Sequence, residues 1–201
     1  MYPDTTAVIL VGYQNDYFAK NGLLHQVVEE SSKLNNVVAN TVTLLKELPQ
    51  NTSVYATPIH FTSTYEELID PVGILKNIKD AGALQAGTDG SKMIAELLSF
   101  EPRIQAIQGK RGFNAFAHTD LHQVLQRDNI EDVIVAGAIT SICIDSTGRA
   151  AQELGYKVSI LSDCTAARTV FEQEFYCENI FPVYANVITH QELLNNLKVA
   201  R

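Results

Sequence analysis

The chain has 201 residues, of which 46% are hydrophobic and 19% are charged, a balance typical of one globular domain with a substantial core. The net charge of −8 and the lack of a basic run disfavour nucleic acid and anionic membranes as partners. Three cysteines are too few and too irregularly spaced for a disulfide framework or a zinc knuckle. No charged leader precedes the first apolar run, and no run reaches bilayer-spanning length, so we expect a cytoplasmic protein with reduced thiols.

Short apolar runs alternate with amphipathic segments along the chain. The short, β-branched runs predict strands at residues 6–11, 53–57, 104–108, 133–136, 157–161 and 183–188. Helical periodicity and stop signals predict helices at residues 27–48, 91–98, 120–127, 140–154 and 191–199. Residues 62–90, which glycine and proline interrupt, are expected to form a long loop with short helical pieces, as lids and binding segments often do. The alternation predicts a single α/β domain over residues 1–201, a three-layer αβα sandwich with a mainly parallel sheet.

One strand-to-helix junction carries a candidate nucleophile. The strand at 133–136 is followed by Gly137, and Thr140 and Ser141 can cap the helix that comes next. Cys143 lies in the first turn of that helix, where the helix dipole and free backbone N–H groups favour a thiolate. The segment predicts an activated cysteine beside an oxyanion site, and the alternative is an inert, buried thiol.

Four polar residues follow the ends of predicted strands: Asp16, His60, Lys110 and Cys143. Ligands of parallel α/β sheets bind beyond the carboxyl ends of the strands, so we expect these side chains to lie near one another. Lys110 is either a surface lysine or a cation that holds the thiolate and later protonates a leaving group. Asp16 either stabilises its turn or, as a provisional third catalytic residue, serves as a base in a Cys-Lys-Asp set.

The remaining titratable residues give weaker signals. Asp163 is expected to cap the helix that follows the 157–161 strand. The histidines offer no clean set of ligands, because the His118 and His122 pair lacks an acidic partner nearby. We therefore expect no metal and no cofactor.

Taken together, three blocks of sequence resemble the isochorismatase-like cysteine hydrolases, a superfamily that includes nicotinamidases, N-carbamoylsarcosine amidases and isochorismatases. The blocks are TAVILVGYQNDYF, GKRGFNAFAHTDL and VIVAGAITSICIDSTGRAAQELGYKVSILSDCTAA. The resemblance extends over nearly the whole chain and implies a Rossmann-like fold, in agreement with the predicted sheet.

The resemblance assigns roles to individual residues. It implies that Cys143 is the nucleophile, that Lys110 is the catalytic lysine, and that the Ala138–Ile139 peptide bond is cis. The backbone amides of Ile139 and Cys143 would then face an oxyanion. The family's first block reads Asp-x-Gln-x-Asp-Phe, but here Gly12 occupies the position of the first aspartate, which is the catalytic base.

The missing carboxylate leaves three functions open. The leading hypothesis is a cysteine hydrolase that cleaves a small-molecule amide or related C–N bond through a Cys143 thioester, with His60 and Phe113 contacting the substrate. The alternatives are a catalytically silent small-molecule-binding protein and a vinyl-ether hydrolase of the isochorismatase type. Nicotinamidase activity is disfavoured, because the Asp-x-His metal set is incomplete before His60. The resemblance also implies a homodimer or homotetramer.

Overall fold

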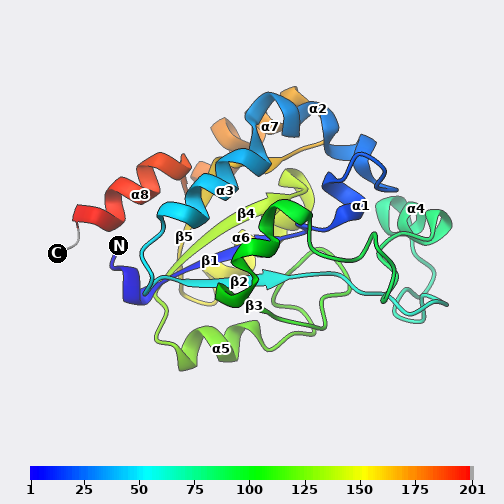
Figure 1. Ribbon diagram of the computed structural model, residues 1–201, viewed down its shortest axis with the longest axis horizontal. Coiled ribbons are helices and arrows are strands. Elements are labelled where there is room, and N and C mark those ends of the chain that lie inside the picture. Colours follow the sequence, from blue (N-terminus) through cyan, green and yellow to red (C-terminus); the bar gives the residue numbers. More distant parts are fainter. Residues whose placement is uncertain (200–201) are drawn as a thin grey trace.

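A computed structural model describes the backbone of residues 1–199 and the side chains of residues 1–197 (Figure 1). One parallel sheet has the strand order β3-β2-β1-β4-β5-β6. The strands are β1 (Thr6–Val11), β2 (Ser53–Thr57), β3 (Ile104–Ala106), β4 (Asp132–Ala138), β5 (Lys157–Ala166) and β6 (Asn186–Ile188). Every residue of β1 and β4 is buried, because helices cover both faces of the sheet.

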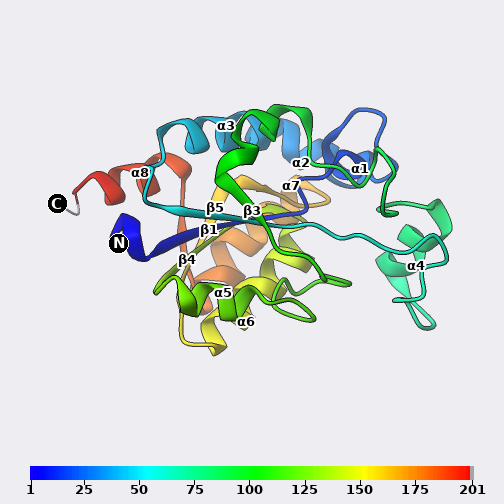
Figure 2. The same cartoon turned by 60° about the horizontal axis from the view of Figure 1, so that its bottom comes forward.

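Helices form the two outer layers. The α-helices are α1 (Asn15–Phe18), α2 (His25–Asn35), α3 (Val37–Glu47), α4 (Gly73–Ala81), α5 (Leu121–Arg127), α6 (Asp145–Glu153), α7 (Val170–Phe175) and α8 (His190–Val199). Helices α2, α3 and α8 pack on one face of the sheet, and α5 and α6 pack on the other (Figures 1 and 2). This arrangement confirms the predicted αβα sandwich. None of the helices within residues 1–199 combines the length and hydrophobicity that a bilayer crossing requires.

Several element boundaries differ from those expected. The single helix expected at 27–48 is two helices, because Asn36 adopts a left-handed conformation with φ of 52° between α2 and α3. The prediction of a helix at 91–98 is wrong. The helical turns span η2 (Ala95–Arg103) instead, and they are of the tighter 3₁₀ type, with Pro102 inside them. Strand β6 begins only at Asn186, because η4 (Tyr176–Ile180) and η5 (Phe181–Val183) occupy the preceding residues.

The strand order places a crevice at one edge of the sheet. Strand β1 lies between β2 and β4, and Val11 at its end is level with Thr57 of β2 and Gly137 of β4. The chain leaves β1 and β4 in opposite directions across the sheet, which makes their carboxyl ends a topological switch point. Helix α4 and its flanking segments lie beyond these carboxyl ends, where the 62–90 loop was expected to cover a site (Figures 1 and 2).

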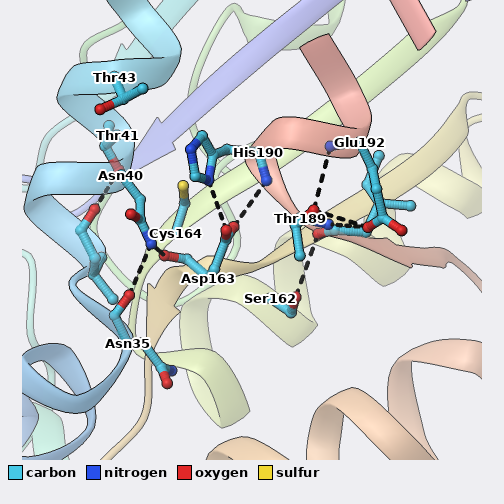
Figure 3. A network of polar contacts seen from close by, with 12 residues as sticks. Asn35, Asn40, Thr41, Thr43, Ser162, Asp163, Cys164, Thr189, His190 and Glu192 are labelled. Carbon is cyan, nitrogen blue, oxygen red and sulfur yellow. Dashed lines mark hydrogen bonds and ion pairs between the residues drawn. The ribbon is translucent and has the colours of Figure 1, made fainter. Parts of the chain in front are cut away.

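Asp163 has a different role from the one predicted. Its carboxylate accepts hydrogen bonds from the backbone amide of His190, at 2.9 Å, and from Nδ1 of the same residue, at 2.6 Å (Figure 3). The carboxylate therefore caps α8, which lies beside β5, and not α7, which follows β5 in the chain. The side chain of Thr169 caps α7 instead.

Candidate active site

Cys143 lies where β4 gives way to a helix. The peptide bond between Ala138 and Ile139 is cis, and the turn that follows, η3 (Thr140–Ile144), is π-helical and continues into α6. The Cys143 side chain is buried, with 4% of its surface exposed. A thiol in the first turn of a helix at a sheet's switch point has the local geometry of a nucleophile.

Lys110 reaches Cys143 from the opposite half of the sheet. It follows β3, yet its Nζ lies 3.6 Å from the Cys143 Sγ and also donates a hydrogen bond to the carbonyl of Gly112. Burial lowers the pKa of Lys110, and the attraction of a negative charge on Cys143 opposes part of that shift. A buried lysine of this kind can exist as a neutral amine, and it can therefore accept a proton as well as donate one.

Two glycines shape the crevice between β1 and β4. A Cβ atom on Gly137, whose φ is +127°, would lie 1.8 Å from the carbonyl oxygen of Val11, so only glycine fits there. Gly12 has a φ of +71°, and its Cβ would lie 3.0 Å from the carbonyl oxygen of Ala138. The crevice therefore has no carboxylate at residue 12, the position to which the resemblance assigns a base.

The ring of Tyr17 borders the space beside Gly12. Two of its ring carbons would lie 3.7 Å from a Cβ on Gly12, and the side chain is only 2% exposed. Burial raises the pKa of Tyr17, and negative charge on Cys143 and Asp16 raises it further, so the hydroxyl remains protonated. No sequence pattern singles out this residue, because an aromatic residue in a turn is usually part of the core.

Helix α7 holds the nucleophile turn in place. Thr140 donates a 2.6 Å hydrogen bond to the side-chain oxygen of Gln173, and Ser141 donates one to Glu172. Glu172 also accepts a hydrogen bond from Arg168, and Gln173 is buried. Thr140 and Ser141 were expected to cap the helix after them, but their hydroxyl groups bind α7 instead. Only the folded chain brings these α7 residues to the turn that carries Cys143, so no local sequence pattern marks them.

Asp16 anchors loops. Its buried carboxylate accepts hydrogen bonds from the amides of Leu23, at 3.2 Å, and Leu84, at 2.7 Å, and it packs closely against Gly90. These contacts fit the turn-stabilising alternative and tie the 62–90 segment to α1. Within residues 1–197, both carboxylate oxygens of Asp16 are engaged by backbone amides, which leaves little reason to assign it a proton-transfer role.

The two expected substrate-contacting residues lie in different cavities. His60 lines a cavity of about 330 Å³ together with Gly12, Gln14 and Gln108. Its ring nitrogens lie 3.0 Å from the Gln108 side-chain oxygen and 3.2 Å from the Ser91 carbonyl oxygen. Phe113, whose side chain is partly exposed, lines a separate cavity of about 540 Å³ with part of the 62–90 segment. The structure therefore does not bring His60 and Phe113 together.

One cluster has the residue types of a metal site. Ligand atoms of Asp163, Cys164 and His190 lie within 4.8 Å of one another (Figure 3). The Asp163 and His190 atoms are 2.6 Å apart, however, which is shorter than the separation of two ligands on one tetrahedral zinc ion. Burial also raises the pKa of Cys164 well above its usual range, which keeps the thiol protonated. The cluster fits a hydrogen-bonded helix cap better than a metal centre.

The comparisons with known proteins agree on one family. The model of the isochorismatase domain matches residues 6–192. The isochorismatase-family protein YecD of Escherichia coli O157:H7 is 35% identical over 88 residues, which are 44% of this chain and 47% of YecD, so the match spans about half of that relative. Nicotinamidase 3 of Arabidopsis thaliana is 26% identical over 145 residues, covering 72% of this chain and 70% of the relative. The crystal structure of a cysteine hydrolase from Pseudomonas syringae pv. phaseolicola 1448A has a TM-score of 0.86 in a match that covers 100% of this chain and 96% of that one. The two sequences are 22% identical, so this match shows a likeness of fold.

Proposed function

Because the chain belongs to the isochorismatase family of hydrolases, we propose that it cleaves a small-molecule amide, or a related C–N bond, through a thioester on Cys143. The observation that carries this proposal is the buried pair of Cys143 Sγ and Lys110 Nζ, 3.6 Å apart at the switch point of the sheet. The relatives named as a nicotinamidase and as a cysteine hydrolase support the substrate class and the nucleophile.

In the acylation half, Lys110 as a neutral amine accepts the proton of the Cys143 thiol. The resulting thiolate attacks the substrate carbonyl, and the lysine ammonium stabilises the thiolate until the bond forms. The backbone amides of Ile139 and Cys143 are the proposed donors to the oxyanion. The ammonium of Lys110 then protonates the leaving nitrogen as the C–N bond breaks, which returns the lysine to its neutral form.

The deacylation half needs a base for water, and Gly12 supplies none. Lys110 is neutral again at this stage, and its lowered pKa makes it the available acceptor for a water proton. One lysine thus moves a proton in both halves of the reaction. This scheme assigns no proton transfer to Asp16 and needs no metal.

Intact mass spectrometry after exposure to 4-nitrophenyl acetate tests the proposal. We expect one acetyl group per chain on Cys143 and none on a Cys143→Ala variant. Cys177 is the matched control, because burial raises its pKa to about 11 and keeps it unreactive near neutral pH. A Cys143 that stays unmodified while the chain is folded would contradict the proposal and favour the silent small-molecule-binding alternative.

A further inference from the structure

The Tyr17 side chain is almost fully buried, and its hydroxyl has no hydrogen-bond partner among the described residues. Buried tyrosine hydroxyls usually find a partner, as Tyr13 does with Thr41 and the Cys164 carbonyl, and Tyr65 does with the Ala83 carbonyl. A hydroxyl left unpaired at the edge of a reactive site is available to a ligand or to water.

The Tyr17 ring borders the crevice at the ends of β1 and β4, where the turn that carries Cys143 begins. The ring packs beside Gly12 at the end of β1, where a Cβ atom on residue 12 would lie 3.7 Å from two of the ring carbons. The two negative charges that act on it are those of Cys143 and Asp16, and Cys143 has the larger effect. Asp16 is already engaged by the amides of Leu23 and Leu84, so Cys143 is the reactive neighbour of the hydroxyl.

We propose that the Tyr17 hydroxyl holds the water that hydrolyses the Cys143 thioester, in place of a carboxylate at residue 12. A protonated phenol offers one donor and two acceptor sites, so it can orient a water molecule but cannot take its proton. Lys110 takes that proton. This inference rests on the proposed function, since it concerns the second half of the same reaction.

The atoms of this step balance. The water oxygen bonds to the thioester carbon while one water proton moves to the neutral amine of Lys110. The C–S bond of the tetrahedral intermediate then breaks and releases a carboxylic acid. Cys143 leaves as a thiolate beside the Lys110 ammonium, which is the protonation state that attacks the next substrate. Tyr17 begins and ends the step with its own proton.

Burst kinetics with 4-nitrophenyl acetate separate the two halves of the reaction. The burst of 4-nitrophenolate reports acylation, and the steady rate that follows reports deacylation. For Tyr17→Phe we expect an unchanged burst and a steady rate lowered about tenfold to hundredfold, because the water loses its orientation. The acetyl adduct on Cys143 should accumulate accordingly. Tyr55→Phe is the matched control, because it removes a tyrosine hydroxyl bonded to Asp128, at the amino ends of the strands, and should change neither phase.

Hydroxylamine distinguishes water positioning from a structural defect, because it attacks thioesters without needing a base. With hydroxylamine present, the turnover of Tyr17→Phe should equal the turnover of the parent chain under the same conditions. An unchanged steady rate, or a burst reduced as much as the steady rate, would overturn the inference. Absence of a burst in the parent chain would instead overturn the proposed function.

A second variant covers the case in which Tyr17→Phe does not fold. Site-specific 3-fluorotyrosine at residue 17 keeps the ring and the hydroxyl but makes the hydroxyl more acidic. We expect it to change the pH dependence of the steady rate and to leave the burst unchanged. An identical pH dependence in the fluorinated and parent chains would contradict the assignment.

Discussion

Returning a carboxylate to residue 12 is the sharpest test of how this site works. In Gly12→Asp the new Cβ would lie 3.0 Å from the Ala138 carbonyl oxygen, so the neighbouring backbone must shift slightly. A left-handed φ of +71° costs a non-glycine residue about 1–2 kcal/mol, although aspartate tolerates it better than most residues. With the close contact added, we expect a loss of about 2–3 kcal/mol. For a chain of this length that loss lowers the melting temperature by about 4–12 °C.

The same substitution should accelerate deacylation. A well-placed general base contributes about 10²–10⁴-fold, and the strained backbone at residue 12 reduces this gain. We expect the steady rate of 4-nitrophenyl acetate hydrolysis to rise about tenfold or more, while the burst changes little. The acetyl adduct on Cys143 should become shorter-lived by the same factor, as measured by quenched-flow mass spectrometry.

Gly12→Asn is the matched control, because asparagine has the size of aspartate and the same backbone cost but cannot accept a proton. We expect it to lose similar stability and to gain no rate. If both variants hydrolyse the thioester no faster than the parent chain, water activation does not limit turnover. The reasoning that Lys110 and Tyr17 compensate for a missing base would then be refuted.

Three further substitutions test other parts of the site. Lys110→Met should slow the burst about 10²-fold or more, because no group then accepts the thiol proton. Since the pKa of Lys110 is lowered on folding, the parent chain gains stability as pH rises toward the unfolded lysine pKa. Lys110→Met should therefore be more stable than the parent in urea unfolding at neutral pH, with a difference that shrinks by about pH 10; a constant difference would contradict this. Asp16→Asn should cost about 1.5–3 kcal/mol in the same assay with an unchanged burst, because its carboxylate binds two loop amides. Loss of the burst at full stability would make Asp16 the base. Gly137→Ala should fail to fold, since its Cβ would lie 1.8 Å from the Val11 oxygen, and a melting temperature equal to the parent's would refute that contact.

The sheet could be predicted from sequence because its central strands are buried on both faces. Strand β1 has the predicted bounds, and β4 extends the predicted run by a few residues. A short, continuous apolar run indicates a strand that helices cover on both faces, and both strands are buried in that way. Hydrophobic periodicity missed the break at Asn36, because the apolar pattern continues on both sides of it. Periodicity reports which face is buried, and it does not report a single residue in the left-handed conformation.

The pairing of Cys143 with Lys110 could be anticipated because both follow strands of one parallel sheet. The contacts that refine the site could not, because they join residues that are distant in the chain. Gln173 reaches Thr140 from α7, and Asp163 binds His190 at the start of α8 instead of capping the next helix. Capping rules consider only neighbours in sequence, whereas a buried polar group takes whichever partner the fold brings within reach.

Gly12 and Gly137 both border the crevice, but they constrain the chain differently. The space around Gly137 excludes every other residue, so that glycine is a requirement of the fold. At Gly12 a Cβ atom would lie 3.0 Å from the Ala138 carbonyl oxygen, a tight contact but a far milder one than that at Gly137. In the proposed mechanism one proton passes between Cys143 and Lys110, whose Sγ and Nζ atoms lie 3.6 Å apart, and burial lowers the pKa of the lysine. The pH range in which this chain turns over should therefore depend on the burial of Lys110 more than on any acidic residue.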